Sequence, residues 1–431
     1  MKISPARAAA FRILKKIELD GGLSAALLPE TESSLVGADR GLCHALVLGT
    51  LRRQILLDRY IDALTGGRKL DREVRIILRL GVFQLKFLER VPPHAAINES
   101  VHLTRAAKKA SASGFVNAIL REFVRDEPTL EFADEIDRLV VETSHPASLL
   151  ARWSSQFGAE RAAAIANANN EPPRLAFRRT PRTEEVSISS LINSGVIRHS
   201  EFVSGGFVAE NLTDELRELD ADGRIYFQDE ASQLVGVIAA KFVRHRILDV
   251  CAAPGSKGSL IASLSADREV IAGDLPAKRI EILTRLLRKQ QASNVRIVRY
   301  DAERPLPFAP VFDTILVDAP CSGTGTIRHN PEIRYRVKAD ELERFQARQL
   351  RMLRNAADCL RPAGNLAYST CSLEREENED VIAGFLAERS EFEVVKIDGC
   401  ERFTNADGTV RTYPDRDGID GFFVAVLRRK T

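Results

Sequence analysis

The chain has 431 residues, of which 44% are hydrophobic and 28% are charged, and its formal net charge at pH 7 is +2. This length exceeds what one hydrophobic core usually organises, so we expect two or three globular domains that need no metal or disulfide to fold. The small net charge excludes a uniformly basic protein, although arginines cluster locally, as at Arg52-Arg53 and between Arg344 and Arg354.

The cysteines and the apolar stretches narrow the setting further. The six cysteines form no C-x-x-C pair and have no metal-ligand spacing with the seven histidines, which predicts reduced thiols and no metal site. No run reaches the roughly 18 apolar residues of a membrane span, and the N-terminus lacks the pattern of a signal peptide. We therefore expect a cytosolic protein without membrane association.

Residues 1–127 have a helical pattern. Between Glu73 and Leu88, apolar residues such as Val74, Ile77 and Leu85 recur at the 3.6-residue period of one helix face. Glycine and proline pairs separate segments of helical length, and strand signals are nearly absent. This pattern predicts a compact helical bundle.

Residues 128–223 predict a linker and a small α+β module. Residues 146–167 have the pattern of two helices, 172–179 of a strand, 184–194 of a helix, and a further strand reaches Val208. We expect the module to hold RNA through an exposed basic edge, whose residues are Arg174, Arg178, Arg179 and Arg182.

Residues 224–431 alternate between strand and helix patterns, which is typical of a doubly wound α/β domain. The strands that we expect cover 246–250, 269–273, 295–298, 314–317, 365–368 and 422–427.

A turn of small residues follows the first of these strands. Its glycines match neither the dinucleotide motif G-x-G-x-x-G nor the phosphate-binding motif G-x-x-x-x-G-K-[ST]. Asp274, Asp301 and Asp318 each follow a strand, where carboxylates can meet a nucleoside lying across the sheet. This set fits S-adenosylmethionine, with Asp274 on the ribose and Asp301 on the adenine. The turn residues expected to bind it are Cys251, Ala252, Ala253, Pro254, Gly255, Ser256 and Lys257.

Two cysteine motifs follow later strands of the same sheet. They are Asp318-Ala-Pro-Cys-Ser-Gly-Thr-Gly325 and Ser369-Thr-Cys-Ser372. Carboxyl ends of strands are where α/β sheets bind ligands, so two thiols at this edge predict covalent chemistry. We expect Cys43, Cys359 and Cys400, in contrast, to be core residues.

The chain resembles known families along nearly its whole length. The helical region resembles the NusB family through Arg7-Ala-Ala-Ala-Phe11 and Pro93-His-Ala-Ala-Ile-Asn98, among other segments. With both cysteine motifs, the whole chain resembles RNA cytosine-C5 methyltransferases of the Sun (RsmB) type. The resemblance implies three domains: an all-α NusB-like bundle, an RRM- or ferredoxin-like α+β module and a Rossmann-like class I methyltransferase domain.

The resemblance also implies residue roles. In the RNA enzymes the Thr-Cys thiol, here Cys371, is the nucleophile that attacks C6 of cytosine, and the Pro-Cys thiol, here Cys321, assists product release. DNA cytosine methyltransferases use a Pro-Cys thiol instead, so the sequence alone does not rank the two. Asp318 would bind the cytosine edge, and Lys257 would act beside a thiol or the base. Arg279 matches a position near the cofactor.

The implied substrate is small-subunit ribosomal RNA, with cytidine 967 as the family's usual target. A transfer RNA substrate and a non-catalytic RNA-binding assembly factor are the alternatives, and we expect a monomer. Candidate phosphate contacts are Arg7, Arg52, Arg53, Lys108 and Lys109 in the bundle and Arg328, His329, Asn330, Pro331 and Arg334 after the Pro-Cys motif. The family's turn usually reads Gly-Gly-Lys-Thr, so Ser256 would be strained if its position requires a positive φ.

Overall fold

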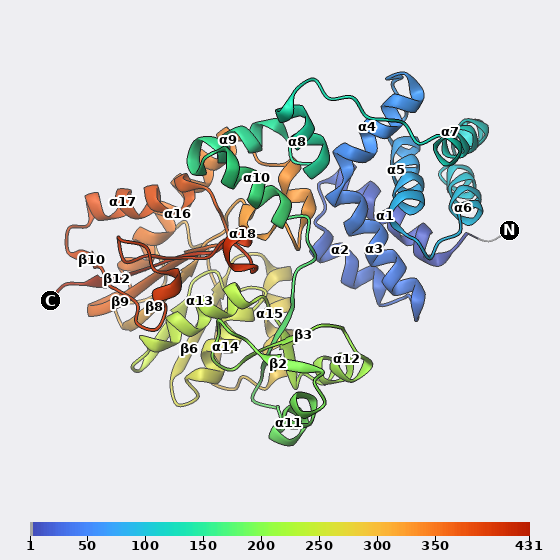
Figure 1. The fold of residues 1–431 in the computed structure, drawn as a ribbon. Coiled ribbons are helices and arrows are strands. Elements are labelled where there is room, and N and C mark those ends of the chain that lie inside the picture. The colour runs from blue at the N-terminus through green and yellow to red at the C-terminus, as the bar shows by residue number, and fades with distance from the viewer. Residues whose placement is uncertain (1–2) are drawn as a thin grey trace. The chain divides into compact units, whose positions relative to one another are not determined.

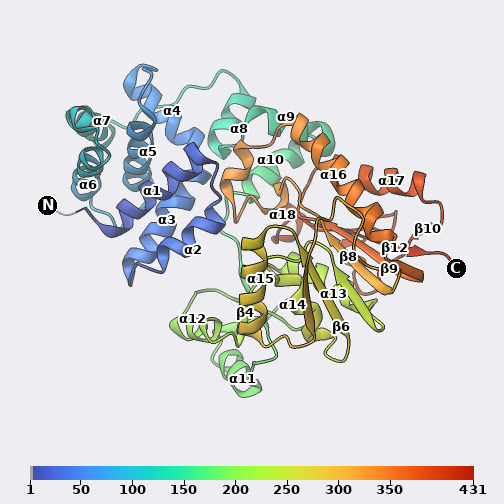
Figure 2. The same cartoon turned by 180° about the vertical axis from the view of Figure 1, so that it is seen from behind.

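The computed structural model describes residues 3–431, which form two compact units. Unit 1 contains the described residues through Glu171 together with Ile327–Arg336, and unit 2 contains Pro172–Thr326 and Val337–Thr431. Figures 1 and 2 show the chain from opposite sides.

Unit 1 is helical, as the sequence predicts. Its helices are α1 (Pro5–Asp20), α2 (Ser24–Glu32), α3 (Ala38–Arg52), α4 (Gln54–Thr65), α5 (Arg72–Phe87), α6 (Pro93–Ala106), the 3₁₀ turn η1 (Ala110–Ala112), α7 (Ser113–Arg125), α8 (Glu135–Thr143), α9 (Ala147–Phe157) and α10 (Ala159–Ala168). The apolar faces of α1 to α8 meet in one core, in which Leu46, Ile77 and Leu120 are completely buried.

One segment of unit 1 comes from much later in the chain. Residues 327–336, which contain the 3₁₀ helix η3 (Pro331–Tyr335), are anchored by buried side chains. Glu332 accepts hydrogen bonds from the backbone N and Oγ of Ser24, and the Tyr335 hydroxyl donates to the Leu51 carbonyl. We call residues 327–336 the anchored segment.

The two compact units divide the chain after Glu171, whereas the domain bounds expected from the sequence, 1–127, 128–223 and 224–431, stay predictions. Helices α8 to α10 belong to unit 1 because they pack with its helices; Ser144, just after α8, accepts a hydrogen bond from the backbone N of Leu56 in α4. The small module groups with the large sheet of unit 2.

The small module has the expected ferredoxin-like arrangement. Its elements are β1 (Leu175–Arg179), α11 (Glu185–Asn193), β2 (Ile197–His199), β3 (Gly206–Ala209), α12 (Asp214–Ala221) and β4 (Ile225–Phe227). The strands form an antiparallel sheet in the order β2-β3-β1-β4, which is the order of a split β-α-β fold.

The prediction that Arg178 lies on an exposed basic edge of this module is wrong, because the residue is only 2% exposed. Its guanidinium donates to the Ser256 carbonyl and to the Ser259 hydroxyl, both in helix α14 (Ser256–Leu264). Arg178 is therefore a structural link between the module and the large sheet, and it is unavailable to RNA.

The large sheet contains every strand predicted for residues 224–431. Its path is β10-β12-β9-β8-β5-β6-β7, with β11 paired to β12. The bounds are β5 (Arg246–Asp249), β6 (Glu269–Asp274), β7 (Val295–Arg299), β8 (Phe312–Asp318), β9 (Leu360–Thr370), β10 (Phe392–Val394), β11 (Val410–Arg411) and β12 (Phe423–Arg429). Strands β5 to β9 run parallel, whereas β10 and β12 are antiparallel to their neighbours.

Helices cover both faces of this sheet (Figures 1 and 2). Successive residues of β5 point to opposite faces of the sheet. Leu248 packs with α16 (Ala339–Ala357) and α17 (Glu379–Glu388), whereas Ile247 packs with α13 (Glu230–Lys241) and α14. The helices are α13 (Glu230–Lys241), α14, α15 (Ala277–Gln290), α16 (Ala339–Ala357), α17 (Glu379–Glu388) and α18 (Pro414–Asp417), and the remaining 3₁₀ turns are η2 (Thr324–Thr326), η4 (Arg375–Glu377) and η5 (Glu401–Phe403).

None of the helices within residues 3–431 is both long and apolar enough to cross a membrane.

Candidate active site

Two loops at the carboxyl ends of neighbouring strands carry the predicted thiols. The Pro-Cys loop (residues 319–326) follows β8, and the Thr-Cys loop (residues 371–374) follows β9. Because β8 and β9 are adjacent and parallel, Cys321 and Cys371 emerge at the same edge, with their Sγ atoms 3.4 Å apart. The structure therefore brings the two thiols into contact, whereas Cys43, Cys359 and Cys400 are buried in the cores, as expected.

The contact changes the chemistry of the thiols. The pKa of Cys321 is raised well above its ordinary value, because the thiol forms a hydrogen bond with Cys371 and is buried. Two touching thiols cannot both become anions easily, so the raised pKa of Cys321 keeps the proton on that sulfur.

Lys257 and Asp318 form an ion pair in the same part of unit 2, with 2.7 Å between Nζ and Oδ2. Burial lowers the pKa of Lys257, but the charge of Asp318 and that of a Cys371 thiolate outweigh burial and raise it overall. The other Asp318 oxygen accepts a hydrogen bond from the Ser369 hydroxyl. The four predicted catalytic residues thus form one cluster.

Close backbone packing fixes the two loops against the chain before β12. The Gly325 amide donates to the Cys371 carbonyl, and the Gly421 amide donates to the Gly325 carbonyl. A Cβ atom on Gly325 would lie 1.9 Å from the Gly421 oxygen, so the chains can approach this closely only because Gly325 has no side chain.

The small-residue turn after β5 lies in the expected place and leads into α14. Its positive φ, +112°, falls on Gly255, whereas Ser256 has a helical backbone as the first residue of α14. The condition for strain at Ser256 is therefore not met, because the glycine before it takes the positive φ.

Asp249 ends β5 directly before this turn and is 1% exposed. Neither carboxylate oxygen has a hydrogen-bond partner among the described residues. Burial, followed by the negative charge of Asp318, raises the pKa of Asp249 to about 8. A buried carboxylate without donors indicates that a cationic or hydrogen-bond-donating ligand completes the site.

The remaining predicted cofactor residues lie at the ends of β6 and β7. Asp274 accepts hydrogen bonds from the backbone N of Ala253 and of Leu275, and Arg279 lies 3.3 Å from its carboxylate. Arg279 also donates to the Ala253 carbonyl and so supports the turn itself. Asp301, two residues beyond β7, accepts from the Glu303 amide.

These residues fit S-adenosylmethionine. Its methionine part carries a cationic ammonium and a sulfonium, which suit the donor-free Asp249, and its ribose hydroxyls can donate to Asp274. The α14 backbone can approach the Asp249 carboxylate because Gly258 has no side chain, since a Cβ there would lie 2.9 Å from Oδ2.

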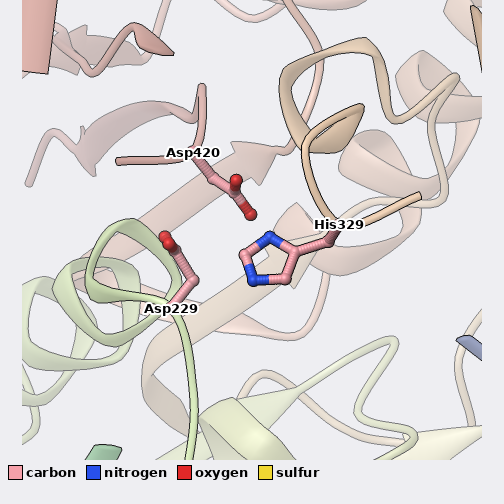
Figure 3. Close-up of side chains that lie close together, drawn as sticks. All are labelled: Asp229, His329 and Asp420. Carbon is pink, nitrogen blue, oxygen red and sulfur yellow. The ribbon is translucent and has the colours of Figure 1, made fainter. Parts of the chain in front are cut away.

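Two further carboxylates of unit 2, those of Asp229 and Asp420, lie close together (Figure 3). Ligand oxygens of Asp229, directly before α13, and of Asp420, before β12, lie within 4.8 Å of each other. Asp229 accepts a hydrogen bond from the Ala231 amide and caps α13, so it has a structural role. His329, also labelled there, lies on the anchored segment of unit 1.

Several predicted phosphate contacts are not available for that role. Arg7 is buried and donates to Gln84. Arg334 is 1% exposed, and its guanidinium donates to the Arg52 and Thr143 carbonyls and to the Asn170 side chain. These arginines hold unit 1 together, whereas Lys108 is exposed.

The sequence reasoning missed three residues beside the thiols. Ser322 and Ser372, each next to a cysteine, donate hydrogen bonds to the buried carboxylate of Glu377. Glu377 stands in the charged stretch Glu374-Arg-Glu-Glu-Asn-Glu379, which is typical of a solvated surface, so only its position in the sequence after the Thr-Cys motif could have identified it.

Two family models match the chain. The family model described as 16S rRNA methyltransferase RsmB/F matches residues 240–428, and the NusB family model matches residues 4–125. The confirmed strands and both cysteine motifs lie within the first range.

Relatives match over the full length. A probable ribosomal RNA small subunit methyltransferase B from Bacillus subtilis (strain 168) is 32% identical, with all of both chains covered. A ribosomal RNA small subunit methyltransferase B from Pasteurella multocida (strain Pm70) is 30% identical, with 98% of this chain and 96% of the relative covered.

Solved structures share the fold. NSun6 from Pyrococcus horikoshii, solved with SFG, has a TM-score of 0.57 and 20% identity, with 66% of this chain and 98% of that chain covered. From the family matches and the full-length relatives, the chain belongs to the RsmB/F family of 16S rRNA methyltransferases, and it is an RNA methyltransferase that uses S-adenosylmethionine.

Proposed function

We propose that this enzyme methylates C5 of a cytidine in 16S ribosomal RNA through a covalent bond between Cys371 and C6 of the base. The observation that carries the proposal is the contact of the Cys321 and Cys371 thiols beside the Lys257–Asp318 ion pair. A methyl transfer to a nucleophilic nitrogen or oxygen needs no thiol, whereas C5 of cytosine is too weak a nucleophile to react unaided.

In this mechanism the Cys371 thiolate attacks C6 and forms a carbon–sulfur bond, which turns C5 into an enamine-like nucleophile. After methylation of C5, loss of the C5 proton breaks the bond to sulfur and restores the aromatic ring. S-adenosylmethionine, when bound, supplies the methyl group in an activated sulfonium form.

An electrostatic interaction with Lys257 supports Cys371 as the nucleophile. A thiolate at Cys371 raises the pKa of Lys257. The Cys321 thiol instead keeps its proton, because its contact with Cys371 and its burial raise its pKa. We therefore propose that Cys371, whose charge interacts with Lys257, is the nucleophile and that Cys321 assists product release.

Asp318 is proposed to stabilise the activated base. Its carboxylate lies between Lys257 and Ser369 and can accept a hydrogen bond from the exocyclic amine or from a protonated N3 of cytosine. Asp249, Asp274, Asp301 and the turn from Cys251 to Lys257 would hold the cofactor. Arg279 would support the turn through its bond to Ala253.

The proposed target is cytidine 967 of the ribosomal RNA. We further propose that the enzyme acts in the cytoplasm, as a monomer and without a metal. The base must leave its stack to reach a thiol at the sheet edge.

The proposal is tested by incubating the protein with labelled S-adenosylmethionine and protein-free 16S ribosomal RNA, followed by nucleoside mass analysis. We expect 5-methylcytidine, and sequencing of the product should place it at 967. Label in a different nucleoside would contradict the C5 chemistry, and label in a transfer RNA control alone would contradict the substrate.

A further inference from the structure

Glu377 lies behind the two cysteine loops and contacts both of them. Its Oε1 accepts hydrogen bonds from the Ser322 backbone N at 2.9 Å and from the Gln349 side chain at 3.0 Å. Its Oε2 accepts from the hydroxyls of Ser322 and Ser372, each at 2.5 Å. Because these serines directly follow Cys321 and Cys371, one carboxylate connects the residues next to both thiols.

The four contacts suit an ionised carboxylate, which offers about four acceptor positions and no donor. Glu377 is fully buried, and no Lys or Arg within residues 3–431 forms an ion pair with it. Burial raises the pKa of Glu377 above its ordinary value, while the hydrogen bonds from Ser322, Ser372 and Gln349 oppose this shift by favouring the ionised form. A group with this cost of burial needs a role that offsets it.

Neighbouring bonds hold Glu377 itself in place. The Tyr368 hydroxyl donates to the Glu377 carbonyl, and Gln349 bridges the Glu377 side chain and the Pro320 carbonyl. The next residue, Asn378, accepts from Thr370 and donates to the Ser372 carbonyl. The carboxylate is thus fixed relative to β9 and α16 before the loops contact it.

Other bonds also join the two loops near the thiols. The Ser322 and Ser372 hydroxyl oxygens lie 3.0 Å apart, and the Thr324 hydroxyl oxygen lies 3.3 Å from that of Ser372. Thr324 accepts from the Leu373 amide, and the Gly325 amide donates to the Cys371 carbonyl, but both lie on the far side of Ser322 from Cys321. Ser322, which directly follows Cys321, is thus held by Glu377 and also contacts Ser372 of the other loop.

We propose that Glu377 is a positioning residue that sets the distance between the two thiols by binding Ser322 and Ser372 together. Among the described residues, no hydrogen bond joins its carboxylate to a thiol or to the cofactor residues. Its charge contributes to the raised pKa of Cys321, and its hydrogen bonds position the loops. This inference rests on the proposed function, in which Cys371 and Cys321 act in sequence on one base and must both reach it.

The test measures thiol proximity and catalysis separately in the full-length protein. The protein is equilibrated with graded ratios of reduced and oxidised glutathione, and the Cys321–Cys371 disulfide is quantified by peptide mass analysis. In this exchange the protein's two thiols lose two electrons to one glutathione disulfide, which is released as two thiols. The variants are Glu377→Ala, Glu377→Gln and the matched control Glu393→Gln, an exposed glutamate of β10.

We expect Glu377→Ala to lower the equilibrium constant for the disulfide, and kcat for RNA methylation, by about tenfold or more, because small displacements of reacting groups are costly. The Kd for S-adenosylmethionine should stay within about twofold of wild type, and Glu377→Gln should lie in between, since an amide keeps two of the four acceptor positions. The control should match wild type in all three quantities.

An unchanged disulfide equilibrium in Glu377→Ala would overturn the inference. Should that variant fail to fold by circular dichroism, Ser322→Ala and Ser372→Ala each remove one hydroxyl, and an unchanged equilibrium in both would overturn it equally. A wild-type protein that makes no 5-methylcytidine but shows the Glu377-dependent equilibrium would contradict the proposed function and leave the positioning role in place.

Discussion

At the scale of single residues, the most informative groups are the charged side chains that are buried at the sheet edge. Asp249, Lys257 and Glu377 are each 8% exposed or less, and each meets a different chemical demand. Lys257 forms an ion pair with Asp318, and Glu377 accepts four hydrogen bonds, whereas neither carboxylate oxygen of Asp249 has a hydrogen-bond partner among the described residues. The unsatisfied group is the one assigned to the cofactor.

Asp249 predicts a pH-dependent stability. Its pKa of about 8 in the folded protein lies above its ordinary value near 3.9 in the unfolded chain. Between these values the folded state binds more protons, so the free energy of unfolding falls as pH rises. We expect the Tm of the cofactor-free protein to fall by several degrees between pH 5 and 8, and Asp249→Asn to remove most of this slope.

Calorimetry at both pH values measures this effect. Asp267→Asn, at an exposed aspartate of unit 2, is the control and should keep the wild-type slope. Equal slopes in wild type and Asp249→Asn would show that Asp249 is not the group responsible. The same Asp249 variant should also bind S-adenosylmethionine more weakly, since it loses the charge that faces the ligand.

Among structural elements, the Pro-Cys loop depends on a backbone contact that only glycine allows. In Gly325→Ala, the new Cβ would meet the Gly421 oxygen at 1.9 Å, so one of the two loops must move. We expect loss of methylation by about a hundredfold and a lower Tm. The control, Gly384→Ala inside α17, meets Leu350 only at 3.6 Å and should stabilise the protein by about 0.5–1 kcal/mol.

The first turn of α14 depends on Arg178 of β1. Arg178→Met removes the bonds to the Ser256 carbonyl and the Ser259 hydroxyl, which fix the helix that begins directly after Gly255. We expect the Kd for S-adenosylmethionine, measured by titration calorimetry, to rise about tenfold, since bonds to a charged group contribute about 1.5–3 kcal/mol. Arg198→Met, at an exposed position in β2, is the control, and equal Kd values would refute the link.

The sequence predicted the elements better than it predicted their contacts. The apolar runs of β5 to β9 and the motifs after them were sufficient to locate the thiols, Lys257, Asp274 and Asp318. Arg178, Arg334 and Glu377 were not predictable, because a charged residue is usually exposed and only the tertiary fold shows which ones are buried. The condition for strain at Ser256 is not met for a local reason, since Gly255 takes the positive φ.

At the scale of the whole molecule, the chain enters unit 1 a second time through the anchored segment. It leaves unit 2 after Thr326, directly beyond the Pro-Cys loop, and returns at Val337. The sequence indicated two or three successive domains and gave no sign of this excursion, because it depends on Arg334 finding carbonyl oxygens that lie some 190 to 280 residues earlier.

Arg334 should therefore stabilise the anchored segment. Arg334→Met leaves several buried carbonyl groups without a donor, which costs about 1–3 kcal/mol for each group that water does not reach. We expect faster proteolysis within residues 327–336 and a lower Tm of unit 1. Arg90→Met, at an exposed arginine of unit 1, is the control, and a protease-resistant Arg334→Met protein would contradict the assignment.

The central claim is that Cys371 attacks the base and Cys321 releases the product. Denaturing electrophoresis of each alanine variant, after incubation with 16S ribosomal RNA and S-adenosylmethionine, tests it most directly. We predict that Cys321→Ala accumulates a covalent protein–RNA adduct and that Cys371→Ala forms none. An adduct in Cys371→Ala and its absence in Cys321→Ala would reverse the two roles and contradict the mechanism.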